Sequence, residues 1–345
     1  MKLLVCSSYY YYGHTQGIEP QFYYLYQVPQ SMGHQVDFFD FHTAAKIGVE
    51  QMRRSFLAGL RGGAYDAVFI ATFKDEFDQE TLAEARKYCP IIAWNSDDEW
   101  RWKDYSEPRI NWYSFMVTNS PDVYAENKNT FPNLLHAQWA CTGFWNGLQT
   151  KKDLNFSFAG MVYGKRAEQT QWLGRHAGLQ TFGFGSKNFA LASNSVHWKK
   201  LIQNAAFKLF PLFGGDLLEG RDILSFDRIN GIWNRSKISF TPLDSSQGEV
   251  RQIKSRVFDM GLSGTLMLAH RAPHLDEYYE PGCEYIPFDS LEECTDKARY
   301  FLSHEAERQR IAEAYAKRTQ AEHMWKSRLE AILTRTGLMS QDKPR

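Results

Sequence analysis

Short apolar segments alternate with longer amphipathic segments along the first part of the chain. Each apolar segment is only a few residues long, whereas the segments between them carry apolar residues at helical spacing. Strands that alternate with helices favour a parallel sheet that is covered by helices on both faces. The pattern predicts strands at residues 3–6, 36–39, 67–71, 91–94, 115–117 and 134–136, with helices at 19–32, 44–60 and 79–88.

The same alternation starts again after a mostly polar stretch at residues 146–153. It predicts a second α/β domain, followed by a long charged helical region with a break near His323. We therefore expect domains at 1–148 and 153–318, and then a C-terminal helix and tail at 319–345. The second series predicts strands at residues 156–160, 181–185, 238–241, 265–269 and 285–288, with helices at 250–262 and 291–302.

Charge and cysteine usage exclude several classes of protein. Lys and Arg together number 40, as do Asp and Glu, so no net basic charge indicates a nucleic-acid partner. The five cysteines include no CxxC pair, which argues against a disulfide scaffold or a structural zinc site. No apolar run reaches the roughly 18 residues of a membrane span, and residues 3–6 are too short for a signal peptide. We expect a cytoplasmic protein, with the basic pair Lys151 and Lys152 on a solvated face.

The segment from Arg256 to Gly264 carries the clearest candidate chemistry. In a helix that begins near Gln252, Arg256 and Asp259 are three residues apart and share a face. Arginine can neutralise a diphosphate, and a carboxylate can accept hydrogen bonds from ribose hydroxyls. Gly264 is expected to end this helix, and Gly261 is expected to let backbone or ligand approach closely. From the residues alone, the alternative is an ordinary surface salt bridge.

Further motifs follow this segment in a definite order. They are Arg-x-Phe-Asp-x-x-x-x-Gly at 256–264, Thr-Leu-Met-Leu at 265–268, Tyr-Tyr-Glu-Pro-Gly at 278–282, Phe-Asp-Ser-Leu-Glu-Glu at 288–293, Ile-Ala-Glu-Ala at 311–314, and then His323, Trp325 and Arg328. This order resembles the C-terminal domain of group-1 GT-B glycosyltransferases, in the branch that contains the spore-maturation protein CgeB. The resemblance is close over residues 225–333. It implies two Rossmann-like α/β domains that face each other across a cleft, with the C-terminal helix crossing back to the N-terminal domain.

The resemblance also implies an activity. The second domain would bind a nucleotide-diphosphate sugar, and the sugar would move to an acceptor (a protein, a glycan or a small molecule) on the first domain. Asp259 takes the place of the family's nucleotide-binding glutamate, and Arg256 takes the place of its phosphate-side arginine. Where the wider retaining group has a glutamate eight positions earlier, this chain has Arg251, so retaining and inverting mechanisms both stay open. Since GT-B enzymes generally work without an essential metal, we expect no metal and no cofactor besides the donor substrate.

Other donor contacts are expected in loops that follow strands of the second domain. The segment 158–166 resembles the family's strand, glycine loop and basic helix start, so Lys165 or Arg166 would contact the diphosphate, assisted by backbone amides after Gly160. A solvent-facing helix start is the alternative. Phe184 would stack on the base, and the backbone after the strand at 238–241 would meet the sugar or phosphate. The expected donor-site residues are Gly160, Tyr163, Lys165, Arg166, Phe184, Leu243, Arg256, Asp259 and Gly264.

Three residues are candidates for the base that deprotonates the acceptor if the reaction inverts. His14 lies in a glycine-containing loop after the first strand, and Asp97 and Asp98 follow the predicted strand at 91–94. A loop histidine with satisfied hydrogen bonds is the alternative for His14. For the two acids, acceptor recognition and helix capping are alternatives to a role as base.

Two other hypotheses keep the fold and change the chemistry. The residues at 251 and 259 depart from the family's pair of glutamates, which permits a non-catalytic binding or structural protein of a cell-surface or spore-coat pathway. A nucleotide-sugar epimerase would need carboxylates and a histidine that face the donor, and His270 and Glu277 are the candidates for it.

Overall fold

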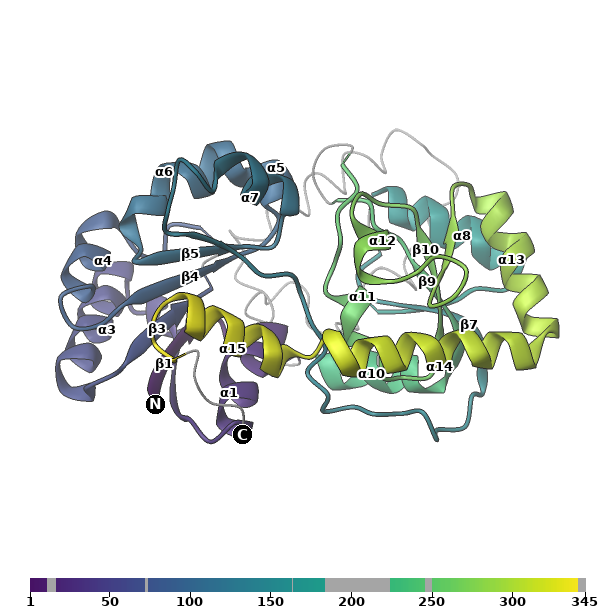
Figure 1. The fold of residues 1–345 in the computed structure, drawn as a ribbon, viewed down its shortest axis with the longest axis horizontal. Coiled ribbons are helices and arrows are strands. Elements are labelled where there is room, and N and C mark those ends of the chain that lie inside the picture. Colours follow the sequence, from purple (N-terminus) through teal and green to yellow (C-terminus); the bar gives the residue numbers. More distant parts are fainter. Residues whose placement is uncertain (11–16, 72–73, 163, 184–223, 246–249, 341–345) are drawn as a thin grey trace. The chain divides into compact units, whose positions relative to one another are not determined.

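The computed structural model describes residues 1–10, 17–71, 74–162, 164–183, 224–245 and 250–340. These residues divide into two compact units. The first unit contains the start of the chain, residues 19–142 and the residues from Glu322 onward, and the second contains residues 143–321. Each unit has its own parallel sheet with helices packed on it (Figure 1). The two α/β domains that the alternating pattern predicted are therefore confirmed.

The described residues of the first unit form a six-stranded parallel sheet in the order β2-β1-β3-β4-β5-β6. Its inner strands are mostly apolar, because helices cover both faces of a parallel sheet. The strands are β1 (Lys2–Ser7), β2 (Gln35–Asp40), β3 (Ala67–Ile70), β4 (Ile91–Asn95), β5 (Phe115–Thr118) and β6 (Leu134–His136). The helices are η2 (Phe22–Gln27), α1 (Val28–Ser31), α2 (Phe41–Ala45), α3 (Val49–Gly63), α4 (Gln79–Ala85), α5 (Asp98–Arg101), η3 (Trp102–Ser106), α6 (Glu107–Arg109), η4 (Ile110–Trp112), α7 (Pro121–Asn127) and α15 (Trp325–Arg335).

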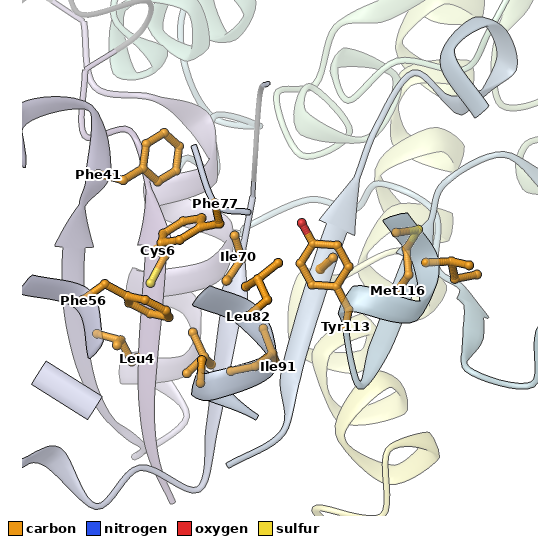
Figure 2. Packing of buried hydrophobic residues seen from close by; sticks show 14 of the residues in the cluster. Leu4, Cys6, Phe41, Phe56, Ile70, Phe77, Leu82, Ile91, Tyr113 and Met116 are labelled. Atoms are coloured by element: carbon orange, nitrogen blue, oxygen red, sulfur yellow. The ribbon is translucent and has the colours of Figure 1, made fainter. Parts of the chain in front are cut away.

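One face of this sheet packs against α3 and α4. Alternate residues of a strand point to opposite faces, and Leu4 and Cys6 of β1 share a core cluster with Phe56 of α3 and Leu82 of α4 (Figure 2). These four side chains are between 0% and 5% exposed. Full burial of an apolar side chain of this size stabilises a fold by about 1.5–3 kcal/mol, so the cluster fixes how the two helices lie on the sheet.

The C-terminal helix α15 belongs to this first unit and packs on the opposite face of the sheet. The ring of Trp325 lies 4.9 Å from the ring of Trp94 on β4, and its indole N–H donates to the carbonyl of Tyr24. The backbone N–H of Cys141 donates to the carbonyl of His323, and that of Trp325 donates to the carbonyl of Cys141, both at 2.8 Å. Both the predicted break near His323 and the predicted return of the C-terminal helix to the N-terminal domain are confirmed.

The described residues of the second unit form a five-stranded parallel sheet in the order β11-β10-β9-β7-β8. Because β8 joins one side of β7 and β9 joins the other, the direction of winding reverses between β7 and β9. Open α/β sheets bind ligands at such a switch point, outside the carboxyl ends of the strands. The strands are β7 (Leu154–Ala159), β8 (Gln180–Phe182), β9 (Ser236–Thr241), β10 (Leu266–His270) and β11 (Ile286–Phe288). The helices are α8 (Lys165–Ala177), α10 (Phe226–Arg235), α11 (Arg256–Asp259), α12 (Leu275–Tyr278), α13 (Leu291–Ser303) and α14 (Glu305–Glu322).

The helix predicted at residues 250–262 is much shorter, because α11 is a single turn that begins at Arg256. The residues before it pair with the loop after β9 instead. Asp244 and Arg251 form an antiparallel bridge, and the N–H of Gln252 donates to the carbonyl of Leu243 at 3.0 Å. The backbone groups that would start a longer helix are therefore held in an extended pairing.

Lys152 does not lie on a solvated face as expected. Its ammonium is partly buried and donates to the carbonyls of Asn234, at 2.8 Å, and Ser263, and to the hydroxyl of Thr265 at 3.3 Å. Burial lowers the pKa of Lys152 to about 8. Carbonyls at the end of a helix or helical turn need hydrogen-bond donors. Lys152 is the donor for one carbonyl at the end of α10 and for one in the turn that follows α11.

Gly261 permits a close approach, but the neighbour is α14 and not a ligand. A Cβ added at Gly261 would lie 2.3 Å from the hydroxyl oxygen and 2.5 Å from the methyl carbon of Thr319. Thr319 is itself fully buried, and its hydroxyl donates to the carbonyl of Tyr315 at 2.8 Å. The glycine therefore sets how closely the turn after α11 packs on α14.

We predict that Gly261→Ala lowers the free energy of unfolding by about 1–3 kcal/mol, the usual effect of overpacking a buried contact. The matched control is Gly231→Ala in α10, where an added Cβ meets nothing within 4 Å. Alanine is favoured over glycine in a helix by about 1 kcal/mol, so the control should be neutral or stabilising. Urea unfolding of both variants measures the difference, and equal midpoints would contradict this packing.

Candidate functional site

Two glycines define the backbone at the switch point of the second sheet. Gly160 follows β7 with a φ of +142°, and its N–H donates to the carbonyl of Phe182 at 3.0 Å. Gly183 has a φ of +114°, and a Cβ added there would lie 2.5 Å from the carbonyl oxygen of Gly160. Neither position accepts a side chain without strain. The loop after β7 can therefore turn closely over the sheet edge.

Arg256 reaches the same strand end from α11. Its Nη1 donates to the carbonyl of Ala159 at 3.4 Å, and its guanidinium lies 5.0 Å from the centre of the Phe158 ring. A Cβ added at Gly160 would lie only 3.0 Å from Arg256 Nη2, so the missing side chain makes room for the guanidinium. A partly buried arginine at the carboxyl end of parallel strands is well suited to bind a phosphate.

The two basic residues at the start of α8 have different environments. Lys165 is exposed at the first helical position, after Gly164, which has a φ of +54°. Arg166 is buried, and its Nη1 donates to the carbonyl of Met161 at 2.9 Å. Its guanidinium also lies 5.8 Å from the ring centre of Phe158, the ring that Arg256 faces. Arg166 therefore fastens the loop after β7, whereas Lys165 is open to solvent.

Three more of the expected donor residues lie near α11 and β9. Asp259 is 5% exposed and follows Arg256 by one helical turn. Leu243 is fully buried, and its carbonyl is already bonded to the N–H of Gln252. Gly264 has a φ of +69° and lies where the turn after α11 ends. The expected residues His14, Tyr163 and Phe184 lie outside the described residues.

In the first unit, Asp97 and Asp98 lie at the carboxyl end of β4. Asp97 has a φ of +66° and leads into α5. Asp98 is 1% exposed, and its Oδ1 accepts a hydrogen bond from the Ser106 hydroxyl at 2.5 Å. The amide of Asn95 donates to the same hydroxyl at 2.9 Å. Burial raises the pKa of Asp98 to about 6.

Glu99 is a third carboxyl at this strand end, which sequence reasoning did not single out. Burial raises the pKa of Glu99 to about 7, with repulsion from Asp97, Asp98 and Asp122 as smaller contributions. Oε2 of Glu99 and Oδ2 of Asp98 are both buried and have no hydrogen-bond partner among the described residues. Carboxyl groups that titrate near neutral pH are suited to act as general bases. Glu99 could have been found in the sequence, because it ends the unbroken acidic run of residues 97–99 that follows a buried strand.

The residues of the epimerase hypothesis are not brought together as a pair. His270 is buried at the end of β10, and its Nδ1 lies 3.3 Å from Oδ2 of Asp244. Glu277 is exposed and pairs with His274 at 2.7 Å. A metal site is a separate question. Among the described residues, no group of three or more His, Cys, Asp or Glu side chains could hold a metal ion. No helix in the described part of the chain is long and apolar enough to cross a membrane.

The match that identifies the protein's family covers most of the second unit and continues into α15 of the first unit. Residues 151–334, more than half of the chain, match the family model described as glycosyl transferase-like. The chain belongs to this glycosyl transferase-like family. The function of a glycosyltransferase, expected from the order of motifs, is thereby confirmed at the level of the family. A search of curated proteins gives no significant match.

Solved glycosyltransferase structures share the fold over nearly the whole chain. HepE of Anabaena, crystallised with UDP-glucose, aligns with a TM-score of 0.60 at 13% identity, over 98% of this chain and 100% of the other. A glycosyltransferase of Rickettsia africae aligns with a TM-score of 0.62 at 10% identity, over 99% of each chain. An α-glucosyltransferase in complex with UDP-glucose and abasic DNA aligns with a TM-score of 0.64 at 10% identity, over 98% and 99%. The two parallel-sheet domains are those of the GT-B fold.

We predict that Asp98→Asn raises the free energy of unfolding at pH 8 by about 1–3 kcal/mol, and that the gain shrinks toward pH 4. The folded pKa of about 6 lies above the ordinary value of 3.8, so the carboxyl destabilises the fold fully above pH 6 and progressively less as the pH falls to 3.8. Urea unfolding at the two pH values measures this dependence. Asp104→Asn, at an exposed position of η3, should change stability by less than about 0.5 kcal/mol. If Asp98→Asn lowered the free energy of unfolding equally at both pH values, burial of the ionised Asp98 carboxyl would not destabilise the fold.

Proposed function

We propose that this glycosyltransferase binds a nucleotide-diphosphate sugar on its second unit and transfers the sugar to an acceptor on its first unit. The observation that carries the proposal is the Arg256 guanidinium beside Gly160, at the carboxyl end of β7. Glycosyltransferases of the same fold were crystallised with UDP-glucose. A UDP-hexose is therefore the donor that we propose first.

In this proposal the second unit stabilises the charge that appears as the sugar leaves. Breaking the bond between the sugar and the diphosphate leaves additional negative charge on the phosphate oxygens. Arg256 would neutralise that charge, and the exposed Lys165 with the amino end of α8 would add to its effect. Since the contacts of Arg256 with Ala159 and Phe158 orient its guanidinium before the reaction, that group would need little reorganisation in the transition state. The mechanism that we propose needs no metal ion and no further cofactor.

The nucleoside would lie next to the diphosphate, toward the other end of α11. Asp259 is the carboxylate that we propose for the ribose hydroxyls, because it lies one turn from Arg256 on the same short helix. Arg166 would act indirectly, since its guanidinium holds the carbonyl of Met161. The loop after β7 would then present its backbone to the phosphates in a fixed shape.

The acceptor would meet the acidic residues after β4. For an inverting reaction, Asp98 or Glu99 would take the proton of the acceptor hydroxyl, because burial brings both carboxyls closer to the pKa of a base that works at neutral pH. Asp97 would contribute to binding the acceptor. The finer assignment that we propose is the branch of the spore-maturation protein CgeB, on the order of motifs from Arg256 to Arg328.

The proposal is tested by incubating the protein with UDP-glucose, UDP-galactose, UDP-N-acetylglucosamine and GDP-mannose, and following release of the nucleoside diphosphate. Binding of UDP and GDP is measured in parallel by calorimetry. Diphosphate release with consumption of the sugar donor supports transfer or donor hydrolysis. Epimerised donor without diphosphate release would favour the epimerase hypothesis, and no binding of any donor or diphosphate would favour the non-catalytic one.

We predict that Arg256→Ala weakens binding of the nucleoside diphosphate by about 10- to 100-fold, which is the worth of a hydrogen bond to a charged group. Arg256→Lys should restore only part of the affinity, since lysine lacks the planar fork of arginine. The control is Arg235→Ala, which removes an exposed guanidinium that pairs with Asp153 at 2.6 Å. Calorimetry gives the dissociation constants and thermal unfolding gives the stabilities. An unchanged dissociation constant in Arg256→Ala would remove Arg256 from the site.

A further inference from the structure

The loop after β9 carries a carboxylate that side chains from several elements hold in place. Gln169 of α8 donates its amide to Oδ2 of Asp244 at 2.8 Å. Nδ1 of His270, at the end of β10, lies 3.3 Å from the same oxygen. Nε of Arg251 lies 3.7 Å from Oδ1. Asp244 is therefore oriented by groups from a helix, a neighbouring strand and its own loop.

These contacts keep Asp244 ionised. The close contact with His270, the hydrogen bond from Gln169 and the charge of Arg251 hold the pKa of Asp244 well below its ordinary value. Arg251 is itself held, because its Nη1 donates to the carbonyl of Arg271 at 3.1 Å. The His270 ring is packed 4.4 Å from the ring of Phe288, which fixes its orientation. The result is a rigid acceptor of hydrogen bonds.

The carboxylate still has capacity for a ligand. Its side chain is 20% exposed, and a carboxylate has about four sites for donors. Oδ2 has two close neighbours, whereas the Arg251 nitrogen near Oδ1 is beyond ordinary hydrogen-bond distance. Oε1 of Gln169 is also buried and has no hydrogen-bond partner among the described residues. The unused groups are acceptors, so the matching ligand offers several hydroxyl donors.

Asp244 also lies at the same edge of the sheet as the strand end that Arg256 contacts. It follows β9, and Arg256 contacts the end of β7, so the two groups lie at the ends of adjacent parallel strands. Neighbouring strands are about 4.8 Å apart, and the sugar of a nucleotide-diphosphate sugar is bonded directly to the phosphate. A diphosphate on Arg256 would thus bring its sugar within reach of the loop after β9.

We propose that Asp244, oriented by Gln169, His270 and Arg251, binds hydroxyl groups of the donor sugar and makes the enzyme prefer the sugar nucleotide over the free diphosphate. This inference rests on the proposed function, because the sugar reaches Asp244 only when the diphosphate is bound at Arg256. The two residues would have separable effects. Arg256 would bind UDP and UDP-glucose alike, whereas Asp244 would act on the sugar alone.

The test compares binding of UDP and of UDP-glucose by calorimetry, for the wild type and for Asp244→Asn. The substitution keeps the shape of the side chain and removes one acceptor and the charge. We expect the affinity for UDP-glucose to fall by about 10-fold or more, with the affinity for UDP changed by less than about two-fold. The matched control, Asp153→Asn, removes an ion-paired carboxylate before β7 and should change neither affinity.

A second variant covers the case in which Asp244→Asn does not fold. Arg251→Gln, at a side chain that is 36% exposed, should reproduce the selective loss of UDP-glucose affinity to a smaller degree. Equal losses for UDP and UDP-glucose would overturn the inference and make Asp244 a support of the loop. Unchanged binding of both ligands would overturn it as well. A wild-type protein that binds neither ligand would refute the proposed function itself, which is a distinguishable result.

Discussion

The guanidinium of Arg256 can lie against the end of β7 only because residue 160 has no side chain. A Cβ there would lie 3.0 Å from the arginine Nη2, and a Cβ at Gly183 would strike the carbonyl of Gly160. The backbone at Gly160, the backbone at Gly183 and the side chain of Arg256 therefore meet at the end of β7, although they are far apart in the sequence. The geometry of the candidate site depends on this crossing, because a loop displaced by one side chain would move both the arginine and the backbone amides after Gly160.

The position of Arg256 also depends on where α11 begins. The pairing with the loop after β9 holds Arg251 and Gln252 extended, so the first helical turn begins only at the carbonyl of Lys254. After the other end, Lys152 donates to the carbonyl of Ser263, in the turn that follows α11. The helix is thus short because both of its ends are bonded to other parts of the second unit. The same bridge that delays the helix holds Asp244 at the sheet edge.

The strands could be predicted from the sequence, because a strand buried on both faces forms a short apolar run, as in β3 and at residues 91–94 of β4. The residues after strand ends, such as Gly160 and Asp98, could be placed by the same argument. The length of α11 and the burial of Lys152 could not, since both follow from contacts between distant segments. Gly261 shows the same limit, because the sequence indicated a close approach but not that Thr319 is the neighbour.

The buried carboxyl of Asp98 in the first unit and the partly buried carboxyl of Asp244 in the second have pKa shifts in opposite directions. Asp98 has few partners in its buried site, so burial raises its pKa, and a proton can be taken up near neutral pH. Asp244 lies close to His270, Gln169 and Arg251, so its pKa is lowered and it stays an anion. A group that must exchange a proton needs the first environment, and a group that must only accept hydrogen bonds needs the second.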